Sequence, residues 1–167
     1  MSTNFFKEFE EKKRRMRILI LGAYSPSIYE DRLSRLKECL LQRNYRNAKL
    51  VKDFPDKPSF HEKRYAHIVA KSQFYIKFWA DALLFVYFRG AMNEGVSIEL
   101  EFCCTKVLEK LGFSVVFGEK DLSLSSMILG SIQIHEIKAD AFENDLELCE
   151  KSIGYLTNFT YRLYWYL

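Results

Sequence analysis

The sequence predicts an α/β fold, a three-layer α/β/α sandwich in which a five-stranded parallel sheet lies between two layers of helices. Strand-like apolar runs alternate with segments of helical periodicity, which is the pattern of βαβ units. Residues 82–88 (ALLFVYF) are apolar without interruption, as expected of a strand buried on both faces of a parallel sheet. Two other strand-like segments, residues 48–53 and 134–138, contain polar residues and therefore suit the edges of the sheet.

The chain begins with a charged segment that precedes the first strand. We expect residues 1–16 to form a leader, possibly helical, with Phe5, Phe6 and Phe9 on one side. The remaining residues, 17–167, have the size and composition of one α/β domain, and they contain no internal repeat or linker.

The first strand is expected at residues 17–21 (RILIL), an apolar run that ends at Gly22. A helix follows over residues 28–43, because its leucines recur at intervals of three and four residues. Pro26 or Ser27 suits the start of that helix.

The next elements are the second strand, a loop and a second helix. Residues 48–53 (AKLVKD) form the polar strand, and residues 54–60 form a loop because they contain two of the three prolines. Residues 61–79 have apolar side chains at helical spacing.

The central strand, residues 82–88, is followed by a polar loop and then a helix. The apolar stripe of this helix consists of Val96, Leu100, Cys103, Val107 and Leu111. A fourth strand is expected at residues 113–117, a short helix at residues 123–133 and an alternating edge strand at residues 134–138. Residues 143–167 are expected to form a long final helix that ends in the aromatic-rich segment FTYRLYWYL.

Right-handed crossovers and polar edge strands favour the flavodoxin-like strand order 2-1-3-4-5. In this order, the loops after the first and third strands face each other at the point where the order reverses. Ligands of open α/β sheets bind there, beyond the carboxyl ends of the strands. We therefore expect one cleft lined by Tyr24, Ser25, Ser27, Asn93 and Glu99.

Composition excludes several functional classes. The net charge is +3, with 25 basic and 22 acidic residues, which is too balanced to predict nucleic-acid binding. The charged N-terminal segment lacks the apolar stretch of a signal peptide, and no window is apolar over the length of a membrane span. The four cysteines show no CxxC pairing, and the three histidines show no metal-ligand spacing with them. We expect a cytoplasmic, reduced protein without metal or cofactor and without a membrane partner.

Common catalytic motifs are missing from the sequence. Only a single glycine, Gly22, follows the first strand, so there is no GxGxxG fingerprint, and Walker and GxSxG motifs are also absent. What remains is Glu99 at the head of a helix, beside hydroxyl groups and an amide. A carboxylate in that position can act on an oxocarbenium-like centre. Alternatively, Glu99 is only a first-turn carboxylate that the helix dipole favours.

The order of these segments resembles the nucleoside 2-deoxyribosyltransferases and their hydrolytic relatives, the deoxynucleoside 5′-monophosphate N-glycosidases. The likeness rests on a small-residue loop after the first strand, Ala-Asp before an apolar strand, and Asn-x-Gly-Val-x-x-Glu opening a helix. The resemblance implies that Glu99 is the nucleophile that attacks the sugar C1′ and expels the base. The resemblance further implies that Asp81 matches a position where the family often has an aspartate, and that Tyr24 lies near an aromatic residue of the family in the first loop. Asn93 stands where the family usually has an aspartate, and an amide can hold a hydroxyl group but cannot act as an acid.

Three functions stay open from the sequence. The first is cleavage or transfer of an N-glycosidic bond in a nucleoside, nucleotide or related N-riboside, with NAD cleavage by a TIR-like chemistry as a variant. Its expected catalytic residues are Glu99, Asp81 and Asn93, and its expected substrate-binding residues are Gly22, Tyr24, Ser25, Ser27, Gly95 and Ser97. The second is a nucleotide-binding or sensing module without turnover.

The third function is an interaction protein that works through its aromatic C-terminal helix. The aromatic residues there are too many for one core-facing stripe: Tyr155, Phe159, Tyr161, Tyr164, Trp165 and Tyr166. We therefore expect a homodimer or higher oligomer that buries part of this surface.

Overall fold

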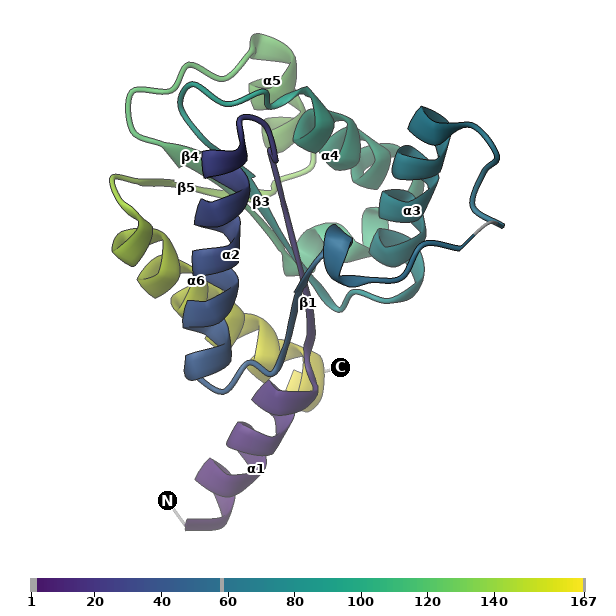
Figure 1. Cartoon of the computed structure of the whole chain (residues 1–167). Helices are drawn as coiled ribbons and strands as arrows, with labels where there is room; N and C mark the ends of the chain where they lie inside the picture. The colour runs from purple at the N-terminus through teal and green to yellow at the C-terminus, as the bar shows by residue number, and fades with distance from the viewer. Residues whose placement is uncertain (1–2, 58, 167) are drawn as a thin grey trace.

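The computed structural model describes residues 3–57 and 59–166 and contains the predicted α/β sandwich (Figure 1). Its strands are β1 (Arg17–Gly22), β2 (Asn47–Leu50), β3 (Ala82–Tyr87), β4 (Ser114–Glu119) and β5 (Lys138–Phe142). They form a five-stranded parallel sheet in the order β2-β1-β3-β4-β5. The predicted flavodoxin-like order is therefore confirmed.

Helices cover both faces of this sheet. These covering helices are α2 (Ser27–Gln42), α3 (Arg64–Phe78), α4 (Glu94–Lys106), α5 (Ser126–Ile134) and α6 (Asp145–Tyr161), whereas α1 (Thr3–Arg15) projects beyond the sheet (Figure 1). Short 3-10 turns η1 (Val51–Asp53) and η2 (Leu108–Phe113) follow β2 and α4, and a π-helical turn η3 (Arg162–Tyr166) follows α6. Among the described residues, no helix combines the length and the apolar character that crossing a membrane requires.

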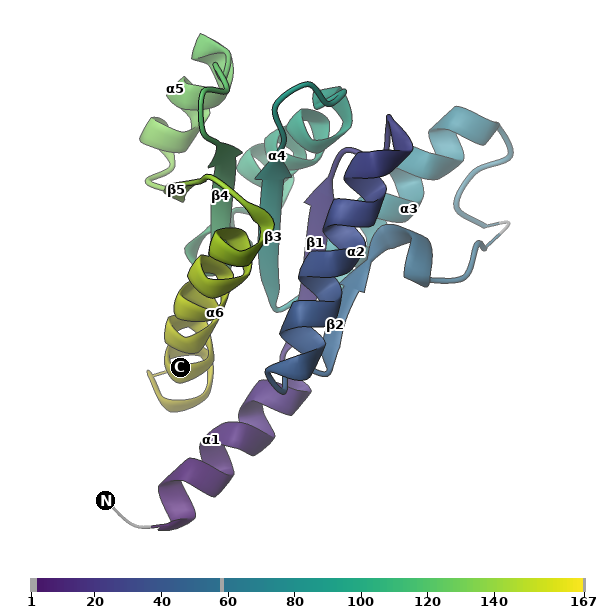
Figure 2. The ribbon, with the colours of Figure 1, turned by 60° about the vertical axis from the view of Figure 1, so that its left-hand side comes forward.

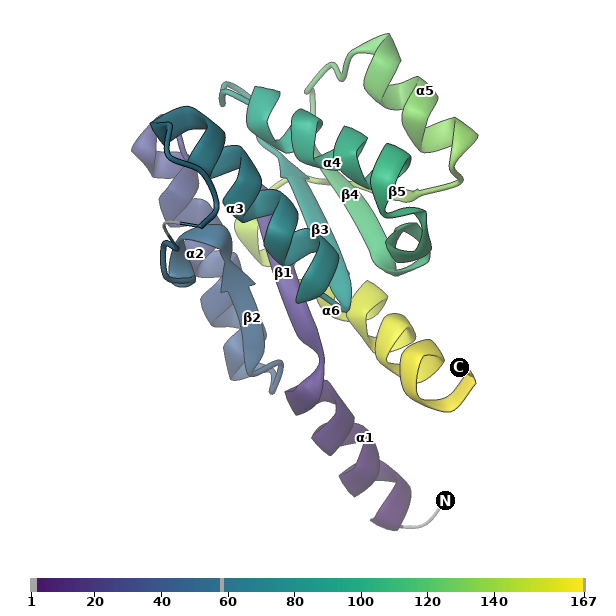
Figure 3. The same ribbon diagram turned by 90° about the vertical axis from the view of Figure 1, so that its right-hand side faces the viewer.

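The two faces of the sheet have separate hydrophobic cores. On one face α2 and α6 lie side by side, and the predicted stripe Leu33, Leu36 and Leu40 is buried there (Figure 2). On the other face lie α3, α4 and α5, whose apolar residues pack against side chains of β1, β3 and β4 (Figure 3). Every residue of β3 is buried, as expected of a strand covered from both sides.

The position predicted for the last strand was wrong. Residues 134–138 were expected to be β5, but α5 continues to Ile134 and β5 begins only at Lys138. Glu136 takes a left-handed backbone conformation, with φ of 51°, and Ile137 is buried beside α5. The alternation of apolar and polar residues at 134–138 therefore comes from the end of a helix followed by a turn. Ile137 is buried in that turn, so it has the same apolar signal as the inward-facing residue of a strand.

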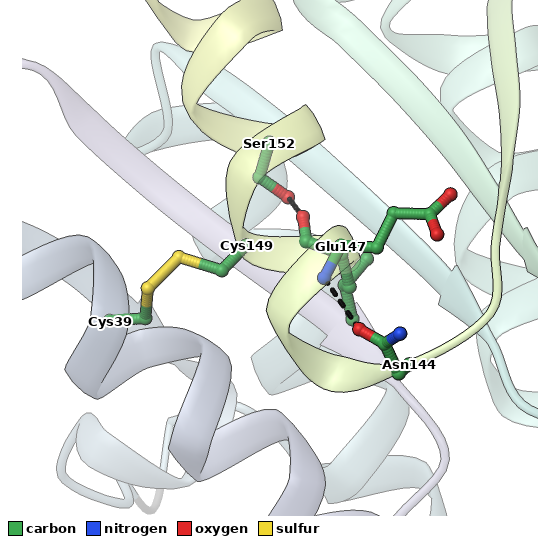
Figure 4. Close-up of a disulfide and its surroundings, with 6 residues drawn as sticks. Cys39, Asn144, Glu147, Cys149 and Ser152 are labelled. Carbon is green, nitrogen blue, oxygen red and sulfur yellow. Dashed lines mark hydrogen bonds between the residues drawn. A yellow bond between two sulfur atoms is a disulfide. The ribbon is translucent and has the colours of Figure 1, made fainter.

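A disulfide joins Cys39 of α2 to Cys149 of α6 (Figure 4). The expectation that all four cysteines are reduced was therefore wrong for two of them, whereas Cys103 and Cys104 are free and buried. The start of α6 is fixed close by, because Asn144 accepts a hydrogen bond from the backbone N–H of Glu147 at 2.8 Å. The layer formed by α2 and α6 is thus covalently cross-linked.

The N-terminal helix α1 packs against the C-terminal turn. Trp165 stacks on Phe9 and lies against Phe5, with ring centroids 5.6 and 5.5 Å apart. The ammonium group of Lys12 lies 3.9 Å from the centre of the Trp165 ring, which is cation–π geometry. Part of the aromatic surface of the C-terminal segment is therefore covered by α1 of the same chain.

Candidate functional site

A cleft of about 460 Å³ opens at the carboxyl end of the sheet, between the end of β1 and helices α3 and α4. Its lining residues are Ile20, Leu21, Gly22, Ala23, Tyr24, Ser25, Val51, Ile68, Ser72, Met92, Glu94, Gly95 and Glu99. This is the point where the strand order reverses between β1 and β3. A cleft is therefore present at the predicted location, beyond the carboxyl ends of β1 and β3.

Two contacts tie the loop after β1 to the loop after β3. The backbone N–H of Met92 donates to the carbonyl of Ser25 at 3.2 Å, and the Tyr29 hydroxyl donates to the carbonyl of Arg89 at 2.7 Å. Gly90 has a φ of 81°, and a Cβ there would lie 2.8 Å from the Tyr29 hydroxyl. These contacts hold the mouth of the cleft in one shape.

Glu99 points from α4 toward α3. The Ser72 hydroxyl donates a hydrogen bond to its Oε1 at 2.6 Å, and no ion pair to Glu99 is present within the described part of the chain. Burial raises the pKa of the Glu99 carboxyl to about 7, although the bond from Ser72 opposes the shift. A smaller hollow of about 80 Å³, lined by both residues, continues between the two helices. At neutral pH both the protonated and the ionised form of this carboxyl are therefore populated.

Tyr24 is the aromatic residue of the cleft. Its hydroxyl accepts a long hydrogen bond, 3.5 Å, from the backbone N–H of Lys52. Burial raises the pKa of the phenol, and the nearby Glu99 adds to the shift. The ring is therefore a neutral wall at physiological pH, suited to stacking against a flat ligand.

Five of the residues predicted for the site line this cleft: Gly22, Tyr24, Ser25, Gly95 and Glu99. Ser27, the first residue of α2, is exposed and does not line it. Ser97 donates to the backbone carbonyl of Asn93 at 3.1 Å and also contacts the Tyr87 hydroxyl at 3.2 Å, so it stabilises the first turn of α4.

Asn93 is held inside the loop that precedes α4. Its side-chain NH₂ donates to the backbone carbonyl of Phe88 at 2.9 Å. Its Oδ1 is buried and has no hydrogen-bond partner among the described residues, and the side chain does not line the cleft. Asn93 therefore ties the start of α4 to Phe88, the residue that follows β3.

Asp81 lies at the amino end of the strands, opposite the cleft, contrary to its expected catalytic role. It immediately precedes β3 and binds Arg17 through the backbone N–H at 2.9 Å and through the guanidinium at 2.9 Å. Because β3 has six residues, its length separates Asp81 from the cleft by roughly 20 Å. Asp81 fixes the start of β1 against the start of β3.

Ser72, Met92 and Glu94 are among the cleft residues that sequence reasoning missed. Ser72 had a visible signal, because it is a polar residue in the apolar stripe of α3 and is only 4% exposed. Glu94 opens α4 and is exposed, and it forms no ion pair within residues 3–57 and 59–166. The cleft thus holds two carboxyl groups.

Replacing Gly22 with alanine is expected to destabilise the fold by about 1–3 kcal/mol. A Cβ at this position would lie 2.8 Å from Cδ2 of Leu33 and 3.1 Å from the carbonyl oxygen of Val86, so the buried Leu33 side chain would have to repack. Urea denaturation would measure the change. Gly95→Ala is the matched control in the same cleft, because no atom lies within 4 Å of its added Cβ. Equal stability of the two variants would contradict this packing argument.

Glu99 is also expected to make stability depend on pH. The folded state prefers the protonated carboxyl, so the stability from binding this proton is complete below about pH 4.5 and is lost as the pH rises through about 7. Glu99→Gln should therefore be more stable than the wild type at pH 8 by roughly 1–3 kcal/mol. Thermal unfolding at pH 8 and at pH 4 would test this, since the difference should vanish at pH 4. A constant difference at both pH values would show that Glu99 is not the titrating group.

The cleft offers the carboxyl groups of Glu94 and Glu99, the hydroxyl groups of Tyr24, Ser25 and Ser72, and apolar walls. Among the described residues, no group of three or more histidine, cysteine, aspartate or glutamate side chains is placed to hold a metal ion. No protein-family model matches the chain, and no curated protein matches it either.

Proposed function

We propose that this protein cleaves or transfers the N-glycosidic bond of a nucleoside, nucleotide or related N-riboside, with Glu99 as the nucleophile. One observation carries the proposal: a carboxyl group lies in an apolar cleft at the switch point of the sheet, with one hydroxyl partner and a pKa raised to about 7. Carboxyl groups in such surroundings are enriched at catalytic sites. The cleft volume of about 460 Å³ falls within the range for small-molecule sites.

The proposed reaction proceeds through a covalent intermediate. An Oε of ionised Glu99 attacks the sugar C1′ while the bond from C1′ to the base nitrogen breaks, and the electron pair of that bond leaves with the base. The positive charge that develops on the sugar ring is stabilised by the carboxylate. Attack by water on C1′ then releases the free sugar, whereas attack by a second base gives transfer. Ser72 orients the carboxyl throughout by its hydrogen bond to Oε1.

The proposal is tested by chromatography of free base released from deoxynucleosides, their 5′-monophosphates, ribonucleosides and NAD. Wild-type protein and Glu99→Gln are compared at equal concentration. Release by the wild type alone supports both the reaction and the nucleophile. Release by neither protein, or equally by both, overturns the proposal.

A second candidate is a nucleotide-binding or sensing module that uses the same cleft without turnover. The observation that favours it is that neither residue expected to assist Glu99 acts as an acid in the cleft, because Asn93 is an amide held within its loop and Asp81 lies at the amino end of the strands. Saturable binding of a nucleotide with no release of base would support this function over catalysis.

The homodimer through the aromatic C-terminal segment and the cytoplasmic location stay predictions. Stacking of Trp165 on α1 already accounts for part of the aromatic surface that suggested an oligomer. The disulfide between Cys39 and Cys149 argues against a reducing compartment, because most cytosolic proteins keep their thiols reduced.

A further inference from the structure

The ionisable carboxyl groups that line the cleft have no basic side chain beside them in the lining. None of the residues that line the cleft is a lysine, arginine or histidine, and two of them, Glu94 and Glu99, carry carboxyl groups. Lys52 follows the lining residue Val51, but its ammonium group is bound by Glu30 of α2 at 2.9 Å and lies 3.5 Å from the Ser34 hydroxyl. The lining therefore offers no cationic side chain to a phosphate group.

Apart from the nucleophile Glu99 and the solvent-exposed Glu94, the lining of the cleft holds no carboxyl group that could protonate a leaving base. A neutral purine or pyrimidine leaves as an anion unless an acid protonates it, and general acid catalysis contributes about 10²–10⁴-fold to such steps. Asn93 cannot donate an acidic proton, and Asp81 lies beyond the opposite end of β3. The Tyr24 phenol is a weak acid, because burial raises its pKa. A base that already carries a positive charge needs no acid, since it leaves as a neutral molecule.

On the basis of the proposed function, we propose that the cleft selects N-ribosides whose base is cationic and which carry no 5′-phosphate. Glu99 and Glu94 attract the positive base and repel a phosphate, and the Tyr24 ring provides a flat neutral wall for stacking. This ligand also supplies the positive partner that the Glu99 carboxylate lacks among the described residues.

The reaction balances without a further reagent. Ionised Glu99 forms a bond from Oε to C1′, the bond from C1′ to the base nitrogen breaks, and its electron pair neutralises the base. Water then attacks C1′, the ester bond to Glu99 breaks, and the carboxylate is restored. The products are a neutral base, the free sugar and one proton released to solvent.

Four probes separate base charge from phosphate charge: guanosine, 7-methylguanosine, nicotinamide riboside and nicotinamide mononucleotide. Rates of base release at pH 7.5 are divided by the uncatalysed rates, so that the intrinsic lability of the cationic compounds is not counted. We expect this rate ratio to be about tenfold or more higher for 7-methylguanosine than for guanosine, because the neutral base of guanosine needs an acid in order to leave. The ratio should be about tenfold higher for nicotinamide riboside than for nicotinamide mononucleotide, because the 5′-phosphate is repelled by two carboxylates.

Charge variants at the exposed Glu94 test the electrostatic origin of the preference. Glu94→Gln should lower kcat/KM for nicotinamide riboside roughly two- to fivefold and should lower kcat/KM for guanosine by a smaller factor. Glu94→Lys should narrow the gap between nicotinamide riboside and its phosphate. Glu101→Gln is the control, because Glu101 is exposed on the same helix and does not line the cleft.

A binding measurement keeps the inference testable apart from catalysis. Calorimetry with nicotinamide riboside at pH 6, in two buffers of different ionisation enthalpy, should show release of about one proton by the wild type and none by Glu99→Gln. Guanosine should release none. Cleavage that depends on Glu99 but prefers guanosine overturns this inference and leaves the proposed function standing. Absence of all cleavage overturns the proposed function. In that case, proton-coupled binding of nicotinamide riboside still supports the selection of a cationic base. Equally tight binding of guanosine overturns that selection.

Discussion

Glu99→Gln is expected to lower the rate of base release by at least about a thousandfold on any substrate that the wild type cleaves. Glutamine keeps the shape of the side chain and can still accept the hydrogen bond from Ser72, but its amide oxygen is not a nucleophile. Loss of a nucleophile removes a covalent step and not merely a binding contact, so kcat should fall much more than KM rises. Single-turnover assays with chromatographic detection of the base would measure the loss.

The dependence of this rate on pH provides an independent check. Only the ionised carboxylate attacks, and the pKa of Glu99 is raised to about 7, so log kcat/KM should rise with unit slope below that pH and level off above it. Glu101→Gln should keep the profile and the rate of the wild type. A Glu99→Gln variant that retains more than about a tenth of the activity would rule out the nucleophile role.

Removing the disulfide is expected to destabilise the fold by about 2–5 kcal/mol. Cys39 and Cys149 are separated by 110 positions, and a cross-link that closes such a long loop restricts the unfolded chain strongly. Urea denaturation of wild type and of Cys149→Ser, without reductant, would measure the difference.

A thiol reductant provides the control for this experiment. It should lower the unfolding midpoint of the wild type toward that of Cys149→Ser, and it should have no effect on the double variant Cys39→Ser/Cys149→Ser. A wild-type midpoint that is unchanged by reductant would show that the two cysteines do not cross-link α2 and α6.

The strand order could be predicted because the sequence marks it locally. The unbroken apolar run at β3 identifies a central strand, and the polar β2 identifies an edge. The position of the cleft then follows from the topology alone, which explains why Tyr24, Ser25 and Glu99 were brought together correctly.

Other features depend on contacts between distant segments, and no local pattern reveals them. The pairing of Cys39 with Cys149 follows from the packing of α2 on α6, not from their spacing. The start of β5 was missed because Ile137 is buried in a turn, where it has the same apolar signal as a strand residue. Asp81 was misplaced because its catalytic role came from the resemblance alone, whereas its position before β3 puts it at the amino end of the strands, away from the cleft.

The separation of the molecule into two cores bears on how its specificity can be changed by directed evolution. The cross-linked helices α2 and α6 lie on one face of the sheet, whereas α3 and α4, which supply Ser72 and Glu99, lie on the other. A library confined to the cleft-facing positions of α3 and the first turn of α4 leaves the cross-linked core untouched. Such a library is expected to yield a high proportion of folded variants, so a screen would sample new ligand preferences and not mainly misfolded protein.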